Sequence, residues 1–574
     1  MASGGGGSGH GHADMGMLSF AKHVLRGRWF MVFASFLIMY MAGATHLFGV
    51  YSKEIKKSLN YNQETLNLLG FFKDLGANVG VLSGLIAEFT SPWFVLLIGA
   101  GMNFAGYFMI WLAVTGKIAK PQVWHMCMYI CIGANSQNFA NTGALVTCVK
   151  NFPMSRGIML GLLKGFTGLS GAIMTQLYLA IYGNDSTSLI LLIGWLPAVV
   201  SIFFVYTIRI MKVVKQPNEK KIFYQYLYIA ILLAIFLMVM TILQKQIKFS
   251  HGAYVATATV VCSMVFLPLV VAIKEEYSLW KKKLTNSDID HEAPVIESKP
   301  AAPMQPQHNQ IEEIPNPSCF GKIFRPPDRG EDYSILQALL SVDMLILFMA
   351  TFCGLGTSLT AIDNLGQIGE AMGYSTITIK TFTSLVSIWN FSGRVFAGFL
   401  SEHLVTKSGF PRPLMMTFAL LLSCVSHLLI AFPIPGSLYI ASMLTGFSFG
   451  AQLTLLFTII SELFGLKYYS TLFNCGQLAS PIGSYVLNVK ITGILYDREA
   501  MKQLQQQGIT PQPGHDMTCI GTQCYRLSFI ILAAVTAFGA FASFLLVLRT
   551  RKFYKSDIYK KFKEEAKETE KEMG

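Results

Sequence analysis

Fourteen long apolar runs constrain the fold of this chain more than any other feature of its sequence. A helix needs roughly 20 apolar residues to cross a hydrocarbon core about 30 Å thick. Because that layer holds no water, each segment must satisfy its own backbone hydrogen bonds, which favours helices. Hydrophobic residues make up 52% of the chain, as membrane proteins require. The sequence therefore predicts an all-α integral membrane protein.

The apolar runs fall into groups of six, two and six. We place them near residues 29–51, 65–89, 93–115, 122–149, 157–182 and 188–210, then 222–244 and 252–274, then 339–362, 375–401, 411–432, 437–463, 469–495 and 525–549. The corresponding domains are a flexible N-terminus (1–28), a first six-helix bundle (29–211), two additional helices (212–275), a linker (276–334), a second six-helix bundle (335–550) and a charged tail (551–574). The linker is rich in proline and charge, so we expect it to be disordered.

Basic residues are distributed unevenly between the runs. The formal charge is +13, and most cations occupy alternate gaps, including Lys22, Arg26 and Arg28 before the first run, Lys281, Lys282 and Lys283 after the eighth, and Arg549, Arg551 and Lys552 after the last. Cytosolic connections of membrane proteins carry this excess of lysine and arginine. We therefore predict that both termini are cytosolic, in a plasma or vacuolar membrane. The same explanation removes any need for a nucleic-acid partner.

Charged residues inside the runs are candidates for function, because a charge at the centre of a span costs about 2.5–3.5 kcal/mol on insertion scales. Lys73 and Asp74 lie in the second run, Lys164 in the fifth and Arg394 in the tenth. Three cations against one anion favour a substrate that carries a carboxylate, with Arg394 as a bidentate ligand and Lys164 and Lys73 as point charges. The simpler alternative is a structural ion pair between Asp74 and either Arg394 or Lys164.

Two residues are candidates for proton coupling. Asp74 is the first, because the proton affinity of a carboxylate beside a cation changes as a cavity opens and closes. His46 in the first run is the second, since imidazole titrates near neutral pH, although a structural hydrogen bond would also explain it. Lys73 and Asp74 are about 100° apart on a helix, so we expect them not to face each other.

Uncharged polar residues form a stripe in the fourth run. Asn135 and Asn138 share one face of a helix there, and Asn390 and Gln452 are weaker candidates in the second bundle. A single asparagine commonly joins two helices, whereas a dense stripe favours a water-lined surface. We therefore predict substrate contacts at these four residues.

Glycines at four-residue spacing mark two runs. Gly76, Gly80 and Gly84 form one series, and Gly157, Gly161 and Gly165 form the other. Each series lies on one helix face and allows another backbone to approach closely. Static packing and a sliding surface between two moving halves are both compatible with this pattern.

Enzyme and metal chemistry are not indicated. The segment Gly446–Gly450 matches G-x-S-x-G, but that motif requires a strand–turn–helix and here lies in an apolar run. No Walker loop is present and no cofactor is implied. Cys519 and Cys524 lie in the last outer loop and are predicted to form a disulfide. Their spacing would also suit a metal, but only His515 accompanies them, so no metal site is predicted.

Three long strings resemble the plant nodulin-like group of the major facilitator superfamily, which includes the nuclear-fusion-defective proteins. They are YSKEIKKSLNYNQETLNLLGFFKDLGANVG (51–80), CVKNFPMSRGIMLGLLKGFTGLSGAI (148–173) and YYSTLFNCGQLASPIGSYVLNVKITGILYD (468–497). The resemblance implies a major-facilitator fold of two six-helix bundles around a central cavity, with the two central helices added to the usual twelve. Related oxalate and monocarboxylate carriers further imply a small organic anion.

The resemblance also suggests gating residues. The superfamily carries an aspartate followed by basic residues between the second and third spans. Glu88 takes the acid position here but is followed by Phe89, whereas Glu402 is followed by His403 and later by Lys407, which is nearer the pattern. We assign the gating role to Glu88 and Glu402.

We therefore expect a secondary active transporter that works as a single chain in the lipid bilayer by alternating access. Its small-molecule substrate would be a carboxylate-bearing organic anion, and Asp74 would handle a proton. One alternative is a facilitator or exchanger of an amino acid or other zwitterion, whose ammonium group Asp74 would meet. Another is a non-transporting receptor or scaffold that acts through the linker and the tail, which a measurement of flux would distinguish.

Overall fold

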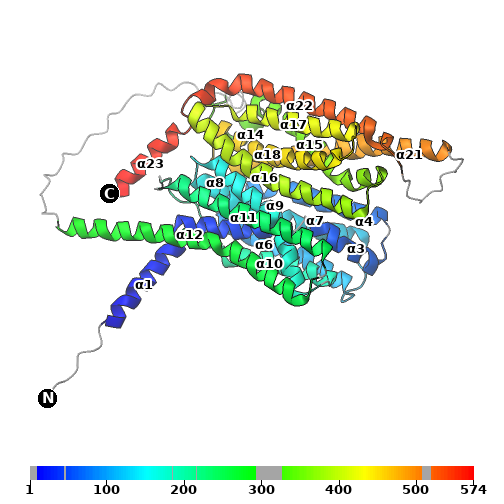
Figure 1. Cartoon of the computed structure of the whole chain (residues 1–574). Helices are drawn as coiled ribbons and strands as arrows, with labels where there is room; N and C mark the ends of the chain where they lie inside the picture. The colour runs from blue at the N-terminus through cyan, green and yellow to red at the C-terminus, as the bar shows by residue number, and fades with distance from the viewer. Residues whose placement is uncertain are drawn as a thin grey trace, which may run out of the picture.

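The computed structural model describes residues 9–43, 47–61, 63–183, 185–214, 216, 218–247, 249–292, 326–506 and 519–573. Within these ranges the chain is predominantly helical and contains no strand. Most helices run side by side along a common direction, with blue to green helices on one side and yellow to red helices on the other (Figure 1). The prediction of an all-α fold built from two helical bundles is confirmed.

The N-terminal half follows an entry helix, α1 (Gly9–Leu25). It comprises α2 (Arg28–Met41), α3 (Phe48–Leu59), α4 (Gln63–Asn78), α5 (Val81–Phe89), α6 (Pro92–Val114), α7 (Val123–Ala140), the π-helix η2 (Asn141–Val146), α8 (Thr147–Asn151), α9 (Arg156–Ile181) and α10 (Ser186–Phe203). The second predicted run is thus divided into α4 and α5, and the break between them lies at Val79 and Gly80.

The C-terminal half begins after the described residues resume at 326. It comprises α14 (Ile335–Leu339), α15 (Val342–Ala371), α16 (Thr376–Ser408), α17 (Arg412–Ala431), α18 (Ser437–Leu463), α19 (Tyr469–Gln477), α20 (Ala479–Ser484), the π-helix η3 (Tyr485–Gly493), α21 (Ile494–Gln506), α22 (Gln523–Lys555) and α23 (Lys560–Met573). Each later predicted run therefore coincides with helical structure.

The two additional helices, α11 (Glu219–Gln246) and α12 (His251–Glu292), pack against the N-terminal half. The buried carboxylate of Glu276 on α12 accepts the backbone N–H of Trp29 at 2.9 Å, in the first turn of α2. Gln244 on α11 exchanges two amide hydrogen bonds with Gln176 on α9. These polar contacts fix the pair to the outside of one bundle, since a buried polar group must find a partner.

The number of spans differs from the expected fourteen. Among the described residues, ten helices are long and apolar enough to cross a membrane, or eleven if the bent pair Met17–Leu25 and Arg28–Met41 is one span. The apolar segment Thr187–Phe203 is shorter. Neither α7 nor α16 is among the ten, and both carry many polar side chains. The count of fourteen is therefore not confirmed, although helical structure lies at every predicted run.

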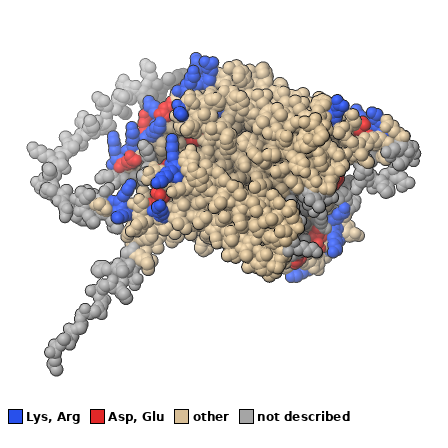
Figure 2. Space-filling model, viewed as in Figure 1, with Lys and Arg blue, Asp and Glu red and all other residues tan. Residues whose placement is uncertain are grey.

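Charged side chains gather at the two ends of the helical bundle (Figure 2). Lysine and arginine gather at both ends of the visible face, and the surface between them is nearly free of charge, as contact with lipid requires (Figure 2). We call the end where α9 begins and α16 ends the basic end; α1 and α23 both lie there (Figure 1). The opposite end carries α21 and the bond between Cys519 and Cys524, and we call it the disulfide end.

Candidate functional site

Arg394 and Lys164 meet where the two halves touch. Each side chain is buried, with only 5% of its surface exposed. Arg394 on α16 donates from Nε to Asn390 Oδ1 at 2.9 Å and from a terminal nitrogen to the carbonyl oxygen of Lys164 at 2.5 Å. Lys164 belongs to α9, so this guanidinium joins the C-terminal half to the N-terminal half.

The ammonium group of Lys164 lies against an aromatic pair from the C-terminal half. Its Nζ is 4.9 Å from the ring centre of Phe457 and 5.0 Å from that of Phe473. The two rings stack with their centres 4.0 Å apart. A cation above an aromatic face is stabilised electrostatically, and burial strengthens the interaction. Hydropathy and spacing do not single out these two phenylalanines among the 42 in the chain.

Neither cation is neutralised by an acid. Among the residues that the structure describes, no carboxylate forms an ion pair with Lys164 or Arg394. The two groups instead repel each other. Burying a charge without a counter-ion is costly, and membrane proteins keep such charges mainly at functional sites. The pair therefore forms a buried positive centre suited to an anionic ligand.

Asp74 does not neutralise this centre, so the alternative of a structural pair with Arg394 or Lys164 is wrong. Its carboxylate lies 2.6 Å from Lys73 Nζ and is 59% exposed. The expectation that these neighbours would not meet is also wrong, because the long, flexible lysine side chain bends back across the 100° that separates their Cα–Cβ bonds. Lys73 also lies 5.4 Å from the ring centre of Phe48 rather than beside Arg394.

A third charged group, Asp363 on α15, faces Lys73 and Asp74 from the opposite half. It is exposed to solvent and yet close enough to both residues to interact with them electrostatically. It also accepts a hydrogen bond from Asn488 at 3.4 Å. Water therefore reaches the space between the halves on this side. Asp363 was missed because it directly follows the predicted run 339–362. His46 lies outside the described residues.

The asparagine stripe serves the backbone rather than a water-filled surface. Asn138 donates to the carbonyl oxygen of Gly76 at 2.9 Å, and Asn135 donates to those of Gly76 and Val79 at 2.9 and 2.7 Å. These carbonyls lie at the break between α4 and α5, where regular helical hydrogen bonds end. The two amide groups thus stabilise the interrupted helix, and the substrate contacts predicted for Asn135 and Asn138 stay a prediction.

Other amide side chains form hydrogen bonds between the two halves. Asn474 donates to Thr142 at 2.9 Å, and Gln477 donates to Asn138 Oδ1 at 3.4 Å. In the described part of the chain, the side-chain oxygens of Asn474 and Gln477 and both amide atoms of Gln452 have no hydrogen-bond partner. Asn390 accepts from Arg394, as noted above. Unpartnered buried amides leave hydrogen-bonding capacity for a ligand or water.

Glycines allow the halves to touch closely on the side of the basic end. A Cβ atom placed on Gly398 would lie 2.9 Å from Gly161 Cα and 2.6 Å from the carbonyl oxygen of Gly157. A Cβ on Gly84 would lie 2.7 Å from the carbonyl oxygen of Ser470. The second series therefore supplies the contact surface of α9 with α16, and Gly84 of the first series supplies that of α5 with α19, whereas Gly76 packs on Cys131 of α7 within the N-terminal half.

The two proposed gating acids both reach the other half. Glu88 on α5 accepts the backbone N–H and the hydroxyl of Thr471 at 3.2 and 3.3 Å. Glu402 on α16 accepts the backbone N–H of Gly157 at 3.1 Å. Close to Glu88, burial lowers the pKa of Lys150, while the negative charge of Glu88 opposes that shift. These contacts join the two halves at the basic end.

Glu402 also belongs to a buried cluster around Arg412, which we call the arginine cluster. Arg412 donates to Glu402 at 2.8 Å and to Glu462 at 2.7 and 2.9 Å. Its remaining contacts are with Ser401 and with Tyr559, and Tyr554 donates to Glu462 at 2.9 Å. The arginine is completely buried, and two carboxylates with several hydrogen bonds satisfy it.

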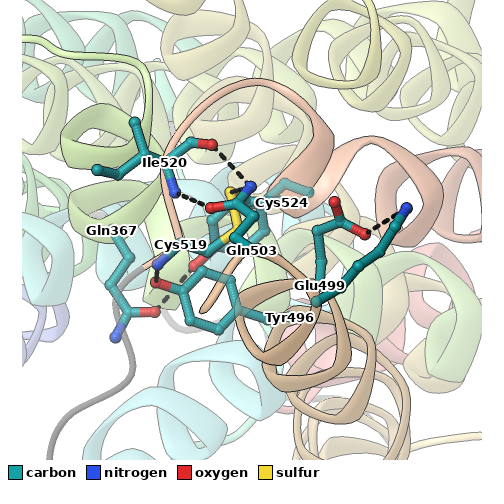
Figure 3. The surroundings of a disulfide bond; sticks show 9 residues. Gln367, Tyr496, Glu499, Gln503, Cys519, Ile520 and Cys524 are labelled. Carbon is teal, nitrogen blue, oxygen red and sulfur yellow. Dashed lines mark hydrogen bonds and ion pairs between the residues drawn. A yellow bond between two sulfur atoms is a disulfide. The ribbon is translucent and has the colours of Figure 1, made fainter. Parts of the chain in front are cut away.

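The disulfide end is fixed by local contacts around the bond between Cys519 and Cys524 (Figure 3). Gln503 on α21 donates to the carbonyl oxygen of Ile520 at 2.9 Å and accepts its N–H at 3.0 Å. Tyr496 accepts the N–H of Cys519 at 3.1 Å. The described residues contain no group of three His, Cys, Asp or Glu side chains that could hold a metal ion.

Two family models match consecutive parts of the chain. The model described as Nodulin-like covers residues 28–273, and the model described as NFD4, C-terminal domain, covers residues 331–556. Protein NUCLEAR FUSION DEFECTIVE 4 of Arabidopsis thaliana is 24% identical over 545 residues, which are 92% of this chain and 89% of that protein. Probable transporter MCH1 of Wickerhamomyces anomalus is 20% identical over 460 residues, which are 79% and 77% of the two chains.

Solved structures give the same fold. The proton:xylose symporter XylE of the major facilitator superfamily, bound to 6-bromo-6-deoxy-D-glucose, matches with a TM-score of 0.51 and 12% identity, over 93% of this chain and 96% of that one. A double-tryptophan mutant of XylE matches with a TM-score of 0.53 and 12% identity, over 90% and 95%. At such low identity, the likeness concerns the major-facilitator architecture alone.

Proposed function

We propose that this chain, whose two halves match the Nodulin-like model and the NFD4 C-terminal model, is a secondary active transporter of the major-facilitator type. The proposed substrate is a small organic anion that carries a carboxylate. A single chain contains both halves and the site between them, so the transport unit in this proposal is a monomer. The basic end faces the cytosol, in a plasma or vacuolar membrane, in keeping with the distribution of lysine and arginine.

One observation carries the proposal: Lys164 and Arg394 are buried together without an acidic partner in the described structure. A carboxylate entering between the halves would supply the missing negative charge. Arg394 has the planar donor geometry that holds two carboxylate oxygens, whereas Lys164 offers a point charge. To bind the anion, Arg394 would exchange its bond to the Lys164 carbonyl for one to the substrate, which couples binding to the contact between the halves.

The position of Lys164 and Arg394 between the two halves supports alternating access. At the basic end Glu88, Glu402 and the glycines contact the opposite half, while Asp74 and Asp363 are exposed to solvent, which supports a state that is closed at the basic end. We assign the solute's entry in this state to the disulfide end. Proton coupling is assigned to Asp74, with His46 as the second candidate. The exposed position of Asp74 beside Lys73 supports this assignment, because both residues border the space that must close.

A solute screen in proteoliposomes tests the proposal. Purified protein would be offered labelled organic acids, their uncharged amides and amino acids, with and without a pH gradient. We expect uptake of the acids, no uptake of the matched amides, and greater accumulation of the acids when the gradient is present. Uptake of amides at the same rate as the acids would contradict the anion assignment, and absence of flux for every solute would favour a receptor or scaffold.

Exchange or facilitation of a zwitterion is the second candidate. The exposed carboxylates of Asp74 and Asp363 favour it, because an ammonium group could lie near them while the substrate carboxylate meets Arg394. In the same screen this candidate predicts uptake of amino acids and failure of the corresponding acids that lack an amino group.

A further inference from the structure

The last described segment of the chain returns to the contact between the halves. After α22 the backbone turns at Ser556 and Asp557, and Tyr559 is inserted beneath the arginine cluster with 4% of its surface exposed. Its hydroxyl lies 2.7 Å from Glu402 Oε1 and 3.2 Å from Glu462 Oε1, and it accepts an N–H from Arg412 at 3.0 Å. These partners all belong to the C-terminal half.

A second set of contacts joins the same segment to the N-terminal half. The guanidinium of Arg156, in the first turn of α9, lies 5.6 Å from the ring centre of Tyr559 and 5.2 Å from that of Phe562. Met154 of the N-terminal half also packs in the small apolar cluster that contains Val405 and Tyr559. The segment therefore touches both halves at the basic end, and α23 lies at that end in Figure 1.

The anchors of the segment are unequal between the halves. Besides the arginine cluster, Lys561 forms an ion pair with Glu331 at 2.8 Å, next to Asp332, which accepts two N–H groups from the loop before α19. These groups belong to the C-terminal half, to which α22 also connects the segment covalently. In the part of the chain that the structure describes, the contacts that join it to the other half are those of Arg156 and Met154. When the basic end opens, the segment must therefore stay with the C-terminal half and release Arg156.

We propose that residues 556–573 form a latch that holds the basic end closed, with Tyr559 and Phe562 as the catch and Arg156 as the group they retain. The latch rests on the proposed function only in requiring that the basic end opens at all. It acts by stabilising one conformation, because its contacts with Arg156 exist only while the halves are together. Weakening the catch shifts the conformational equilibrium toward the open basic end.

A distance measurement tests the latch in the full-length protein. Spin labels would be attached through noncanonical amino acids at Phe89 and Lys407, which are exposed at the basic end on opposite halves. We expect the double variant Tyr559→Leu with Phe562→Ala to increase the population with the longer distance about two- to fivefold, the factor that corresponds to loss of an ordinary cation–π contact. A distribution identical to that of the wild type would overturn the proposal.

Two further variants keep the test decisive. Phe562→Ala alone removes a half-buried ring and is expected to shift the distribution in the same direction even if the double variant folds poorly. Tyr206→Leu is the matched control, since Tyr206 is 80% exposed; a shift of equal size there would overturn the assignment to the latch.

The reverse experiment links the latch covalently to the N-terminal half. Met154 and Ile558 both pack against the cluster of Val405, Tyr554 and Tyr559, so joining Met154→Cys to Ile558→Cys with a reducible thiol cross-linker is expected to abolish the longer distance until a reductant is added. A cross-linked chain that opens as freely as the reduced one would overturn the latch. These distances need no solute, so the expected shifts together with absent flux would contradict the proposed function and leave the latch standing.

Discussion

Arg394 makes two hydrogen bonds with different consequences. The bond to Asn390 lies within one helix, whereas the bond to the Lys164 carbonyl crosses between the halves. Under the proposed function, a substrate carboxylate would compete with the bond that crosses between the halves. Arg394 would then both bind the anion and hold the halves together, and this dual role would couple solute binding to movement.

The variant Asp74→Asn tests the proposed proton coupling. The substitution removes the ionisable group beside Lys73 while keeping its size, so exchange of solute across the membrane should continue and accumulation driven by a pH gradient should disappear. Proteoliposome counterflow and gradient-driven uptake would be compared in the same preparation. Glu370→Gln, an exposed acid near the same end, is the control and should keep both activities. Persisting accumulation in Asp74→Asn would assign the proton to another group, such as Asp363 or His46.

Individual charges were predictable, but their partners were not. Lys164 and Arg394 stand out in the sequence because charged residues are rare in apolar helices, and the structure brings them together. The aromatic pair Phe457 and Phe473 could not be identified, because a phenylalanine in a span gives no signal of what it faces. The contact of Asn138 with the break between α4 and α5 could not be predicted, because hydropathy alone does not reveal that break.

Helix contacts on the side of the basic end depend on small residues. The glycine series at four-residue spacing correctly indicated close approach, and the structure shows that α9 meets α16 through Gly161 and Gly398. Spacing alone did not identify the partner helix, since pairing across more than 200 residues is decided by the whole bundle. The two π-helical segments, η2 and η3, were likewise absent from the prediction because hydropathy does not distinguish them from α-helix.

The variant Gly398→Ala tests the close contact between α9 and α16. The added Cβ would lie 2.6 Å from the carbonyl oxygen of Gly157, so α9 and α16 must move apart. We expect the closed basic end to be destabilised by about 1–3 kcal/mol, the usual penalty of overpacking. Thermal unfolding in detergent should show a lower Tm than wild type. Gly101→Ala is the matched control, because no atom lies within 4 Å of its added Cβ; an unchanged Tm in Gly398→Ala would show that this contact has little weight.

The two halves are in contact at the basic end, and solvent reaches Asp74 and Asp363 between them toward the disulfide end. Polar side chains, glycine contacts and the C-terminal latch all act on the basic end, whereas Asp74 and Asp363 face solvent between the halves toward the disulfide end. The architecture was predictable from the grouping of apolar runs and the resemblance to a known family. The contacts that join the halves at the basic end were not predictable, because neither hydropathy nor family resemblance indicates which end of the bundle is closed.

Uptake by the Arg394→Gln variant tests whether the buried positive charge receives the substrate. The solute would be an organic acid transported by the wild-type protein in proteoliposomes, and Arg526→Gln, an exposed arginine at the start of α22, would serve as the control. Glutamine keeps hydrogen-bonding capacity but removes the charge. We therefore predict that Arg394→Gln inserts and folds normally but loses uptake, and that Arg526→Gln transports the solute as the wild type does. Normal uptake by correctly folded Arg394→Gln would contradict a site in which buried positive charge receives the substrate.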